Sequence, residues 1–520
     1  MTGPQDALPA RFNMAAWCLE PGGPRDPEKT GLVLAADAEA RDAARFTFAE
    51  LDAAVRAIAA GLAAAGLRRG ERLVIALPDT ADYLLLFYGA IAAGIVPLPA
   101  SSLLTAAELA FLVADAGAAA VAGNVTPSVA GGVRVLAPAD IAAIRAAPPQ
   151  AGYADTAPED PAFLIYTSGT TRQPKGVLHA HRSAWGRRPT YAGWSGIGAE
   201  DVMLHAGAFN WSYTLSAGLA DPWANGATAV LFHGTRDGSV WAPLIAATGA
   251  TLFAAVPGVY RQMLRQGDIA RLGTGRLRHG LVAGEALPPA LLAEWQAATG
   301  LPLYEAFGMS ECSTFVSNRP GLPIRPGSPG RPQPGRRIAP LPLDGGAAPL
   351  PPGEHGLLAI HRSDPGLMLG YWRRPEEEAA AFRGDWFVAG DVISFDGDGY
   401  VWFQGRADDV MNAGGYRVSP LEVEAALARH AGVAEVAVAE HEVREGVRII
   451  AAWVVPRTGF LPGAALAEEI VAEAAGTLAS YKRPREVFFV DALPRTPNGK
   501  VARRLLRTLG AVPALARRPA

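Results

Sequence analysis

The sequence predicts an α/β protein with two domains: a large N-terminal domain of parallel-rich sheets covered by helices, which also carries a β subdomain, and a small α+β C-terminal domain. Three observations support this prediction. Strand-like and helix-like segments alternate over residues 46–255, proline and glycine become dense over 319–353, and the alternation changes again after residue 406. A chain of 520 residues is also too long for one compact core.

The first stretch alternates helix and strand patterns. Over 46–66 apolar residues recur three or four positions apart, as on one helix face, and Gly66 is suited to end that helix. The apolar run 71–78 predicts a buried strand. The alternation of helix and strand patterns continues along the chain. It predicts a helix and a strand within 84–98, a helix at 106–116, strands at 118–122 and 227–232, a helix at 242–248 and a strand at 252–255. Such alternation predicts parallel sheets covered on both faces.

The second half of the chain predicts two different parts. Short β-like pieces at 356–362, 386–395 and 399–406 indicate an antiparallel or barrel subdomain. The small domain follows, with helices expected at 420–429 and 464–479 and strands at 433–439, 447–455 and 486–490. We therefore predict a large domain over 1–405, a hinge over 406–409 and a small domain over 410–520.

Composition excludes several classes of function. A net charge of −3 and a pI near 6.3 argue against wholesale binding to nucleic acid or an anionic membrane. Two cysteines, Cys18 and Cys312, form neither a disulfide framework nor a metal clip, which favours the cytoplasm. The apolar run 84–100 is short for a membrane span and Pro97 and Pro99 break it, so we interpret it as a core helix followed by a strand.

The strongest motif is a loop rich in hydroxyls and glycine directly after the apolar strand 162–166. It predicts a phosphate-binding loop, because backbone N–H groups, hydroxyls and a lysine can all bind phosphate oxygens. Gly176 follows the lysine where a Walker A loop has Ser or Thr, so the loop is not of that type. The candidate residues are Thr167, Ser168, Gly169, Thr170, Thr171 and Lys175.

This loop resembles the signature of the adenylate-forming superfamily, which includes acyl- and aryl-CoA synthetases, luciferases and the adenylation domains of peptide synthetases. Arg172 stands where that family usually has glycine. Two later segments resemble the family's adenine and magnesium motifs, with Phe307 against adenine, Ser310 on the α-phosphate and Glu311 holding Mg²⁺. The resemblance also implies nucleotide contacts for Gly284, Glu285, Ala306 and Gly308.

The C-terminal third carries the remaining motifs of the same family. Asp391 resembles the aspartate that binds the ribose hydroxyls. The resemblance also implies that Arg406 lies near the nucleotide and that Asp408 is the hinge pivot. The glycine pair of a motif formed by Gly414, Gly415 and Tyr416 would admit the pantetheine arm of CoA. Lys500, in a Pro-Asn-Gly-Lys turn, resembles the catalytic lysine of the mobile small domain.

The resemblance implies an AMP-forming ligase that uses ATP, Mg²⁺ and CoA. A carboxylate attacks the α-phosphorus to form an acyl-adenylate, and after the small domain rotates the CoA thiol displaces AMP. Lys500, Glu311, Thr167 and Lys175 are the implied catalytic residues. An enzyme that loads a carrier protein, a nucleotide-binding regulator without catalysis and a luciferase-like oxygenase remain alternatives, and the sequence leaves a homodimer open.

The acid is expected to be aromatic or of medium size and apolar. The aromatic residues of segment 208–215 predict an apolar wall, and segments 282–284 and 306–309 complete the expected pocket. The opening of the chain and its layout are similar to benzoate–CoA ligases and medium-chain acyl-CoA synthetases. The pocket residues are expected to be Phe209, Trp211, Tyr213, Ala283, Gly284, Gly308 and Met309.

Overall fold

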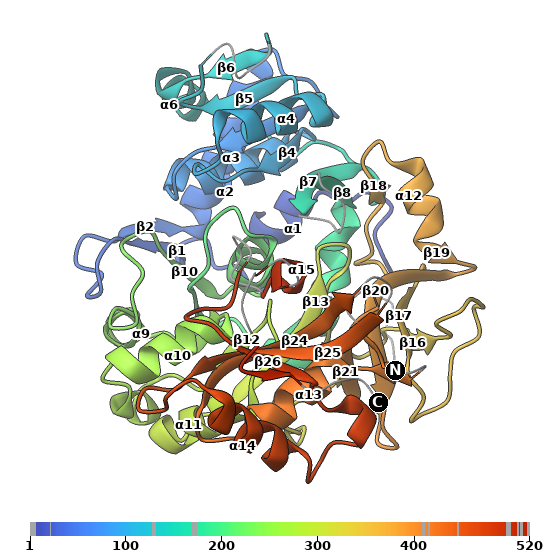
Figure 1. The fold of residues 1–520 in the computed structure, drawn as a ribbon. Helices are drawn as coiled ribbons and strands as arrows, with labels where there is room; N and C mark the ends of the chain where they lie inside the picture. The colour runs from blue at the N-terminus through green and yellow to red at the C-terminus, as the bar shows by residue number, and fades with distance from the viewer. Residues whose placement is uncertain are drawn as a thin grey trace. The chain divides into compact units, whose positions relative to one another are not determined.

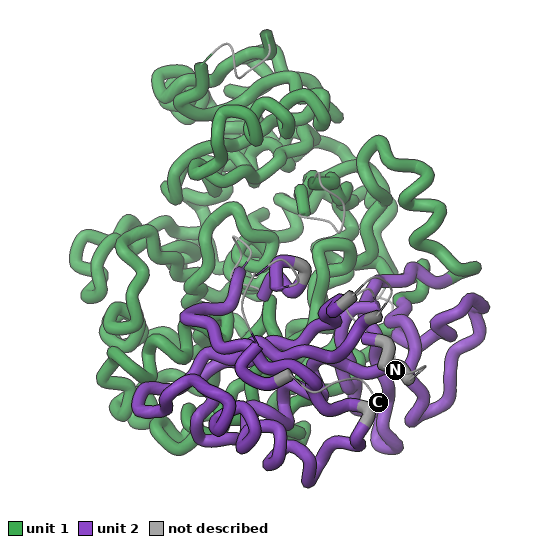
Figure 2. Tube along the Cα trace, viewed as in Figure 1, with its two compact units in different colours: residues 1–337, 360–385 green, residues 338–359, 386–520 purple. Residues whose placement is uncertain are grey.

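The structure is a computed structural model of the chain. It describes residues 7–20, 22–126, 132–167, 174–407, 411–413, 416–444, 447–495, 501–506, 509 and 513–516. The chain folds into two compact units, shown in Figure 2. Unit 1 comprises Met1–Arg337 and Ile360–Asp385, and unit 2 comprises Ile338–Ala359 and Trp386–Ala520. The boundaries of these two units differ from the predicted domain boundary near residue 405. That domain boundary stays a prediction.

Unit 1 contains a nine-stranded sheet in the order β15-β14-β13-β12-β11-β9-β10-β1-β2, of which β1, β2, β10, β12 and β13 are labelled in Figure 1. Its parallel strands are β1 (Thr30–Ala35), β9 (Val202–His205), β10 (Thr228–Phe232), β11 (Leu252–Ala255), β12 (His279–Val282) and β13 (Leu303–Met309). The antiparallel strands are β2 (Ala44–Thr47), β14 (Ser313–Ser317) and β15 (Arg331–Pro332). The predicted strands at 227–232 and 252–255 are confirmed as β10 and β11.

A second sheet of unit 1 is wholly parallel, in the order β4-β3-β5-β6. Its strands are β3 (Arg72–Ala76), β4 (Val96–Pro99), β5 (Ala120–Gly123) and β6 (Arg134–Leu136), and the neighbouring helices are α2 (Phe48–Ala64), α3 (Ala81–Ala92), α4 (Ala106–Ala116) and α6 (Pro138–Arg145). The apolar run 84–100 forms α3 and β4, both largely buried, as predicted. None of the described helices has both the length and the apolar character that crossing a membrane would require.

A three-stranded antiparallel sheet, β18-β8-β7, carries the phosphate-loop motif. Strand β7 (Pro161–Thr167) pairs with β8 (Lys175–Ala180), which pairs with β18 (Gly370–Tyr371). The other helices of unit 1 are α1 (Met14–Leu19), α7 (Arg188–Thr190), α8 (Asp221–Ala224), α9 (Trp241–Thr248), α10 (Pro257–Gln266), α11 (Pro289–Thr299) and α12 (Pro375–Ala380), with a short strand β19 (Phe382–Arg383). Single-turn helices include η2 (His181–Ser183) and η3 (Trp185–Arg187).

Unit 2 joins a β subdomain to a small α+β part. The β subdomain contains β16 (Ile338–Leu341), β17 (Gly356–His361), β20 (Trp386–Phe395) and β21 (Val401–Arg406). The α+β part has a mixed sheet of β24 (Val433–Arg444), β25 (Val447–Pro456), β26 (Glu486–Phe489) and β27 (Leu515–Ala516), a hairpin of β22 (Met411–Ala413) and β23 (Tyr416–Val418), and helices α13 (Pro420–Leu427), α14 (Ala464–Ala474) and α15 (Arg503–Leu506). Helix α14 ends earlier than the predicted residue 479.

Candidate active site

The predicted phosphate loop connects two paired strands. Thr167 ends β7 and lies opposite Lys175, the first residue of β8, so both are held at the mouth of one hairpin. Leu164 and Val177, inside the hairpin, are fully buried, which anchors it to the core. The loop residues Ser168, Gly169, Thr170, Thr171 and Arg172 lie outside the described residues.

Lys175 contacts side chains from two later elements. Its Nζ lies 3.7 Å from the centre of the Tyr371 ring, a cation–π contact. The same atom lies 3.7 Å from Oε2 of Glu377 in α12. An aromatic face and a partly exposed carboxylate therefore both contact the lysine that follows the loop in the sequence.

Glu311 contacts the hydroxyl end of Tyr371. The Tyr371 hydroxyl donates a 2.8 Å hydrogen bond to Oε1 of Glu311, and the Met368 N–H donates a 2.7 Å bond to the Glu311 backbone carbonyl. Within the described residues Oε2 of Glu311 has no hydrogen-bond partner. Tyr371 thus connects Lys175 and Glu311, which the sequence separates widely.

Glu311 is partly buried, and a single carboxylate of this kind fits Mg²⁺. This cation keeps several waters and typically takes one or two protein carboxylates together with substrate phosphates. Among the described residues, no group of three His, Cys, Asp or Glu could form a metal site made only of protein. One carboxylate such as that of Glu311 would suit a magnesium ion that arrives with nucleotide phosphates.

Two buried groups hold the turn that carries Glu311. His179 Nε2 donates a 2.7 Å bond to the Ser310 carbonyl, which places the proton of the neutral ring on Nε2. Burial lowers the pKa of His179 to about 4, and its ring stacks on Phe163 at 4.7 Å. The neutral imidazole acts here as a fixed donor to the turn.

The other group is a buried ion pair. Arg187 contacts Asp221 through two bonds of 2.6 and 2.5 Å, and both side chains are at most 4% exposed. Arg187 also donates to the hydroxyl of Ser313, whose φ of 62° is unusual for a residue other than glycine. The arginine thereby stabilises the backbone conformation just after Glu311.

The predicted acid-pocket residues divide between one apolar cluster and the core. Tyr213, Ala283 and Ala306 pack in a cluster with Trp194, on which the Tyr213 ring stacks at 6.0 Å. Phe209 is fully buried in the main core, and Trp211 is half-buried. Of these residues, Ala283 directly follows β12 and so lies at the carboxyl end of a parallel strand, where α/β sheets bind ligands.

Two predicted glycines have a structural reason to be glycine. A Cβ on Gly308 would lie 2.4 Å from the Ser313 backbone oxygen, so a side chain there would push the β13–β14 hairpin open. Gly284, just after β12, has a φ of 94°, which disfavours other residues. Glu285 and Met309, also predicted, are half-buried beside them.

Glu305 is a buried carboxyl group that the sequence does not single out. It is 7% exposed and accepts a 3.0 Å bond from the Leu287 N–H. Burial raises its pKa to about 7, because the charged form loses solvation. Two residues further along the same strand, Phe307 is half-buried and packs edge-on against Phe315 at 5.5 Å.

Unit 2 brings together two other predicted residues. Asp391 in β20 lies directly opposite Arg406 in β21, and Nη1 of Arg406 is 3.4 Å from Oδ1 of Asp391. The guanidinium packs against Gly390. Tyr416 begins β23 opposite Ala413, while Asp408, Gly414, Gly415 and Lys500 lie outside the described residues.

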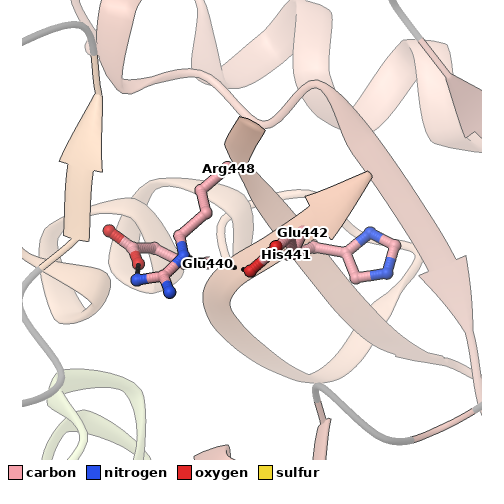
Figure 3. A pocket seen from close by; sticks show the side chains of 4 residues that line it. All are labelled: Glu440, His441, Glu442 and Arg448. Atoms are coloured by element: carbon pink, nitrogen blue, oxygen red, sulfur yellow. Dashed lines mark hydrogen bonds and ion pairs between the residues drawn. The ribbon is translucent and has the colours of Figure 1, made fainter. Parts of the chain in front are cut away.

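A surface pocket in unit 2 is lined by Glu440, His441, Glu442 and Arg448, as Figure 3 shows. Arg448 contacts the two glutamates at 3.6 and 3.3 Å, and the imidazole points away from them. His441 instead contacts Glu486 at 2.6 Å. The segment is a strand in which His441 and the glutamates occupy opposite faces, so it offers no convergent metal ligands.

Comparison with known families identifies the protein class. Residues 23–372 match the AMP-binding enzyme family, and residues 422–500 match the AMP-binding enzyme C-terminal domain. The chain belongs to the AMP-binding enzyme family, in its acid–thiol ligase branch. The predicted fold class, a large N-terminal domain with a small C-terminal domain, is thereby confirmed.

Individual relatives extend over nearly the whole chain. The benzoate–CoA ligase of Thauera aromatica is 34% identical, covering 90% of this chain and 91% of its own. The mitochondrial acyl-coenzyme A synthetase ACSM3 of Rattus norvegicus is 30% identical, covering 96% and 91%. A crystal structure of a benzoate CoA ligase from Burkholderia xenovorans LB400 superposes with a TM-score of 0.83 at 31% identity, covering 95% of this chain and 100% of that one.

Proposed function

We propose that this enzyme joins an aromatic or medium-sized apolar carboxylic acid to CoA, with ATP converted to AMP and pyrophosphate. The observation that carries the proposal is the contact chain from Lys175 through Tyr371 to Glu311. It links a cation that follows the hydroxyl-rich loop in the sequence to a carboxylate whose Oε2 has no hydrogen-bond partner among the described residues, and binding of a magnesium nucleotide requires both kinds of group. The whole-length similarity to acyl- and aryl-CoA ligases supports the same reaction.

In the first half-reaction the acid carboxylate attacks the α-phosphorus of ATP. Three negatively charged groups must approach one another, so fixed cations and N–H donors lower the barrier most. Mg²⁺ held by Glu311 supplies charge neutralisation on the phosphates. Lys500 and the Thr167–Lys175 loop orient the α-phosphate and the leaving pyrophosphate, and Asp391 with Arg406 binds the ribose.

In the second half-reaction the CoA thiol attacks the acyl-adenylate and AMP leaves. Lys500 would obstruct the thiol, so the small domain turns about Asp408 and brings the segment Gly414–Tyr416 to the site. This alternation follows from the family resemblance and stays a proposal. The reducing cytoplasm is the proposed location, because both cysteines are free and buried.

The proposed acid site is the apolar cluster around Tyr213, Ala283 and Ala306. Its surfaces are aromatic and methyl groups, which bind an apolar acid by burial. Segment 208–215, the expected apolar wall, contains no lysine or arginine, which disfavours a second carboxylate on the substrate. Two relatives named benzoate–CoA and 3-hydroxybenzoate–CoA ligase support an aryl acid.

The experiment that tests this proposal is AMP and pyrophosphate release with Mg-ATP and CoA over a panel of acids. The panel contains acetate, butyrate, hexanoate, octanoate, benzoate, substituted benzoates and phenylacetate. We expect turnover to peak on benzoates or on the six- to eight-carbon acids. Pyrophosphate without thioester would indicate a carrier protein as acceptor, and nucleotide binding without turnover on any acid would indicate a regulator.

A further inference from the structure

Tyr371 lies between the two charged groups that the proposed function uses most. It is 7% exposed and belongs to β18, where it pairs with Val177 of β8. Lys175 is two residues from Val177 on the same strand face, so it is a diagonal neighbour of the tyrosine. The backbone pairing therefore sets the ring beneath the lysine.

Each end of the tyrosine side chain has a different partner. The ring face receives the Lys175 Nζ at 3.7 Å, and the hydroxyl donates to Glu311 Oε1 at 2.8 Å. We propose that Tyr371 is a positioning residue that orients Glu311 so that its Oε2 is directed to Mg²⁺, with Lys175 holding the ring in place. This inference rests on the proposed magnesium-nucleotide site.

The physical reason is the strict geometry of magnesium. Mg²⁺ requires near-octahedral oxygen ligands, whereas a half-exposed glutamate has several rotatable bonds and two equivalent oxygens. A charge-assisted hydrogen bond to one oxygen fixes the carboxylate plane and leaves the other oxygen for the ion. Groups that orient metal ligands in this way typically change metal affinity or activity about 10- to 100-fold when removed.

The test measures nucleotide binding rather than turnover. The dissociation constant of α,β-methylene-ATP is determined by calorimetry with Mg²⁺ and again with EDTA. The constant in EDTA divided by the constant with Mg²⁺ gives the factor by which magnesium tightens binding. We expect Tyr371→Phe, which keeps the ring and removes the hydroxyl, to lower this ratio about tenfold or more. The constant in EDTA should stay close to that of the wild type, because Glu311 acts through the metal.

Two control variants isolate the effect. Tyr83→Phe removes a buried hydroxyl that donates to the Ala100 carbonyl at 3.2 Å, and it should leave the ratio unchanged. Glu377→Gln removes the partly exposed carboxylate beside Lys175, and a small effect is expected because such ion pairs contribute little. Thermal unfolding of each variant is measured beside the binding.

A second variant keeps the proposal testable if Tyr371→Phe fails to fold. Lys175→Met keeps the tyrosine and removes the cation, and it should lower the same ratio by a smaller factor. An unchanged ratio in a folded Tyr371→Phe protein, or equal weakening with Mg²⁺ and with EDTA, would overturn the inference. The binding assay needs neither acid nor CoA, so failure of every acid in the panel would contradict the proposed function alone.

Discussion

Removal of Asp221 tests how the turn after Glu311 is held. Asp221 and Arg187 are 2% and 4% exposed, so Asp221→Ala leaves a buried guanidinium without its carboxylate. Breaking a buried pair in this way costs about 3–5 kcal/mol. Arg187 also donates to Ser313, so loss of its partner should disturb the backbone next to Glu311 and reduce adenylation as well. The free energy of unfolding is measured by urea denaturation, and adenylation by pyrophosphate release.

Two comparisons make the result interpretable. Asp82 pairs with Arg145 at a similar 2.7 Å, but the two side chains are 34% and 43% exposed. Asp82→Ala should therefore cost no more than about 1 kcal/mol. The double variant Asp221→Ala, Arg187→Met should recover part of the lost stability, because no buried charge remains unpaired. A cost below about 1 kcal/mol for Asp221→Ala alone would refute the reasoning.

Three further predictions concern Glu305, Gly308 and Lys500. The pKa of Glu305 is raised to about 7, so the folded protein retains a proton that the unfolded chain releases, and stability falls as pH rises from about 4.5 to 7. In urea denaturation, Glu305→Gln should therefore gain stability relative to wild type across that window. A pH-independent difference in stability would contradict the assignment. Gly308→Ala should lower adenylation because its Cβ would meet the Ser313 backbone. Gly198→Ala should leave adenylation unchanged, because no atom lies within 4 Å of a Cβ at that position. Equal activity of both variants would contradict the close approach of Gly308 to Ser313. Lys500→Ala should abolish pyrophosphate release yet largely spare thioester formation from synthetic acyl-adenylate, and equal loss of both half-reactions would refute that role.

Local sequence signals predicted many elements well. Helix α4 spans 106–116 as predicted, because Thr105 and Glu108 form a capping box and Gly117 is left-handed at its end. The predicted helix 464–479 was too long. Its alanine-rich pattern continues past residue 474, but the chain leaves the helix at Ala475, just before Gly476. Alanine favours a helix without fixing where tertiary packing ends it.

The candidate site could be predicted only where a residue belongs to a contiguous motif. Lys175 and Glu311 belong to such motifs, and their roles remain proposals. Tyr371, His179 and Arg187 contact the Glu311 region from distant parts of the chain, through pairing and burial that no periodic pattern indicates. A lone tyrosine after glycine gives no local signal, so only the three-dimensional structure identifies it.

The central claim is that the enzyme activates a carboxylic acid as an acyl-adenylate before thioester formation. The most direct measurement incubates the enzyme with Mg-ATP and the best acid of the panel without CoA, identifies the products, and then adds CoA. We predict acyl-AMP and pyrophosphate in the first step, and acyl-CoA with AMP in the second. ADP and phosphate as products, or pyrophosphate release that does not depend on the acid, would contradict the account.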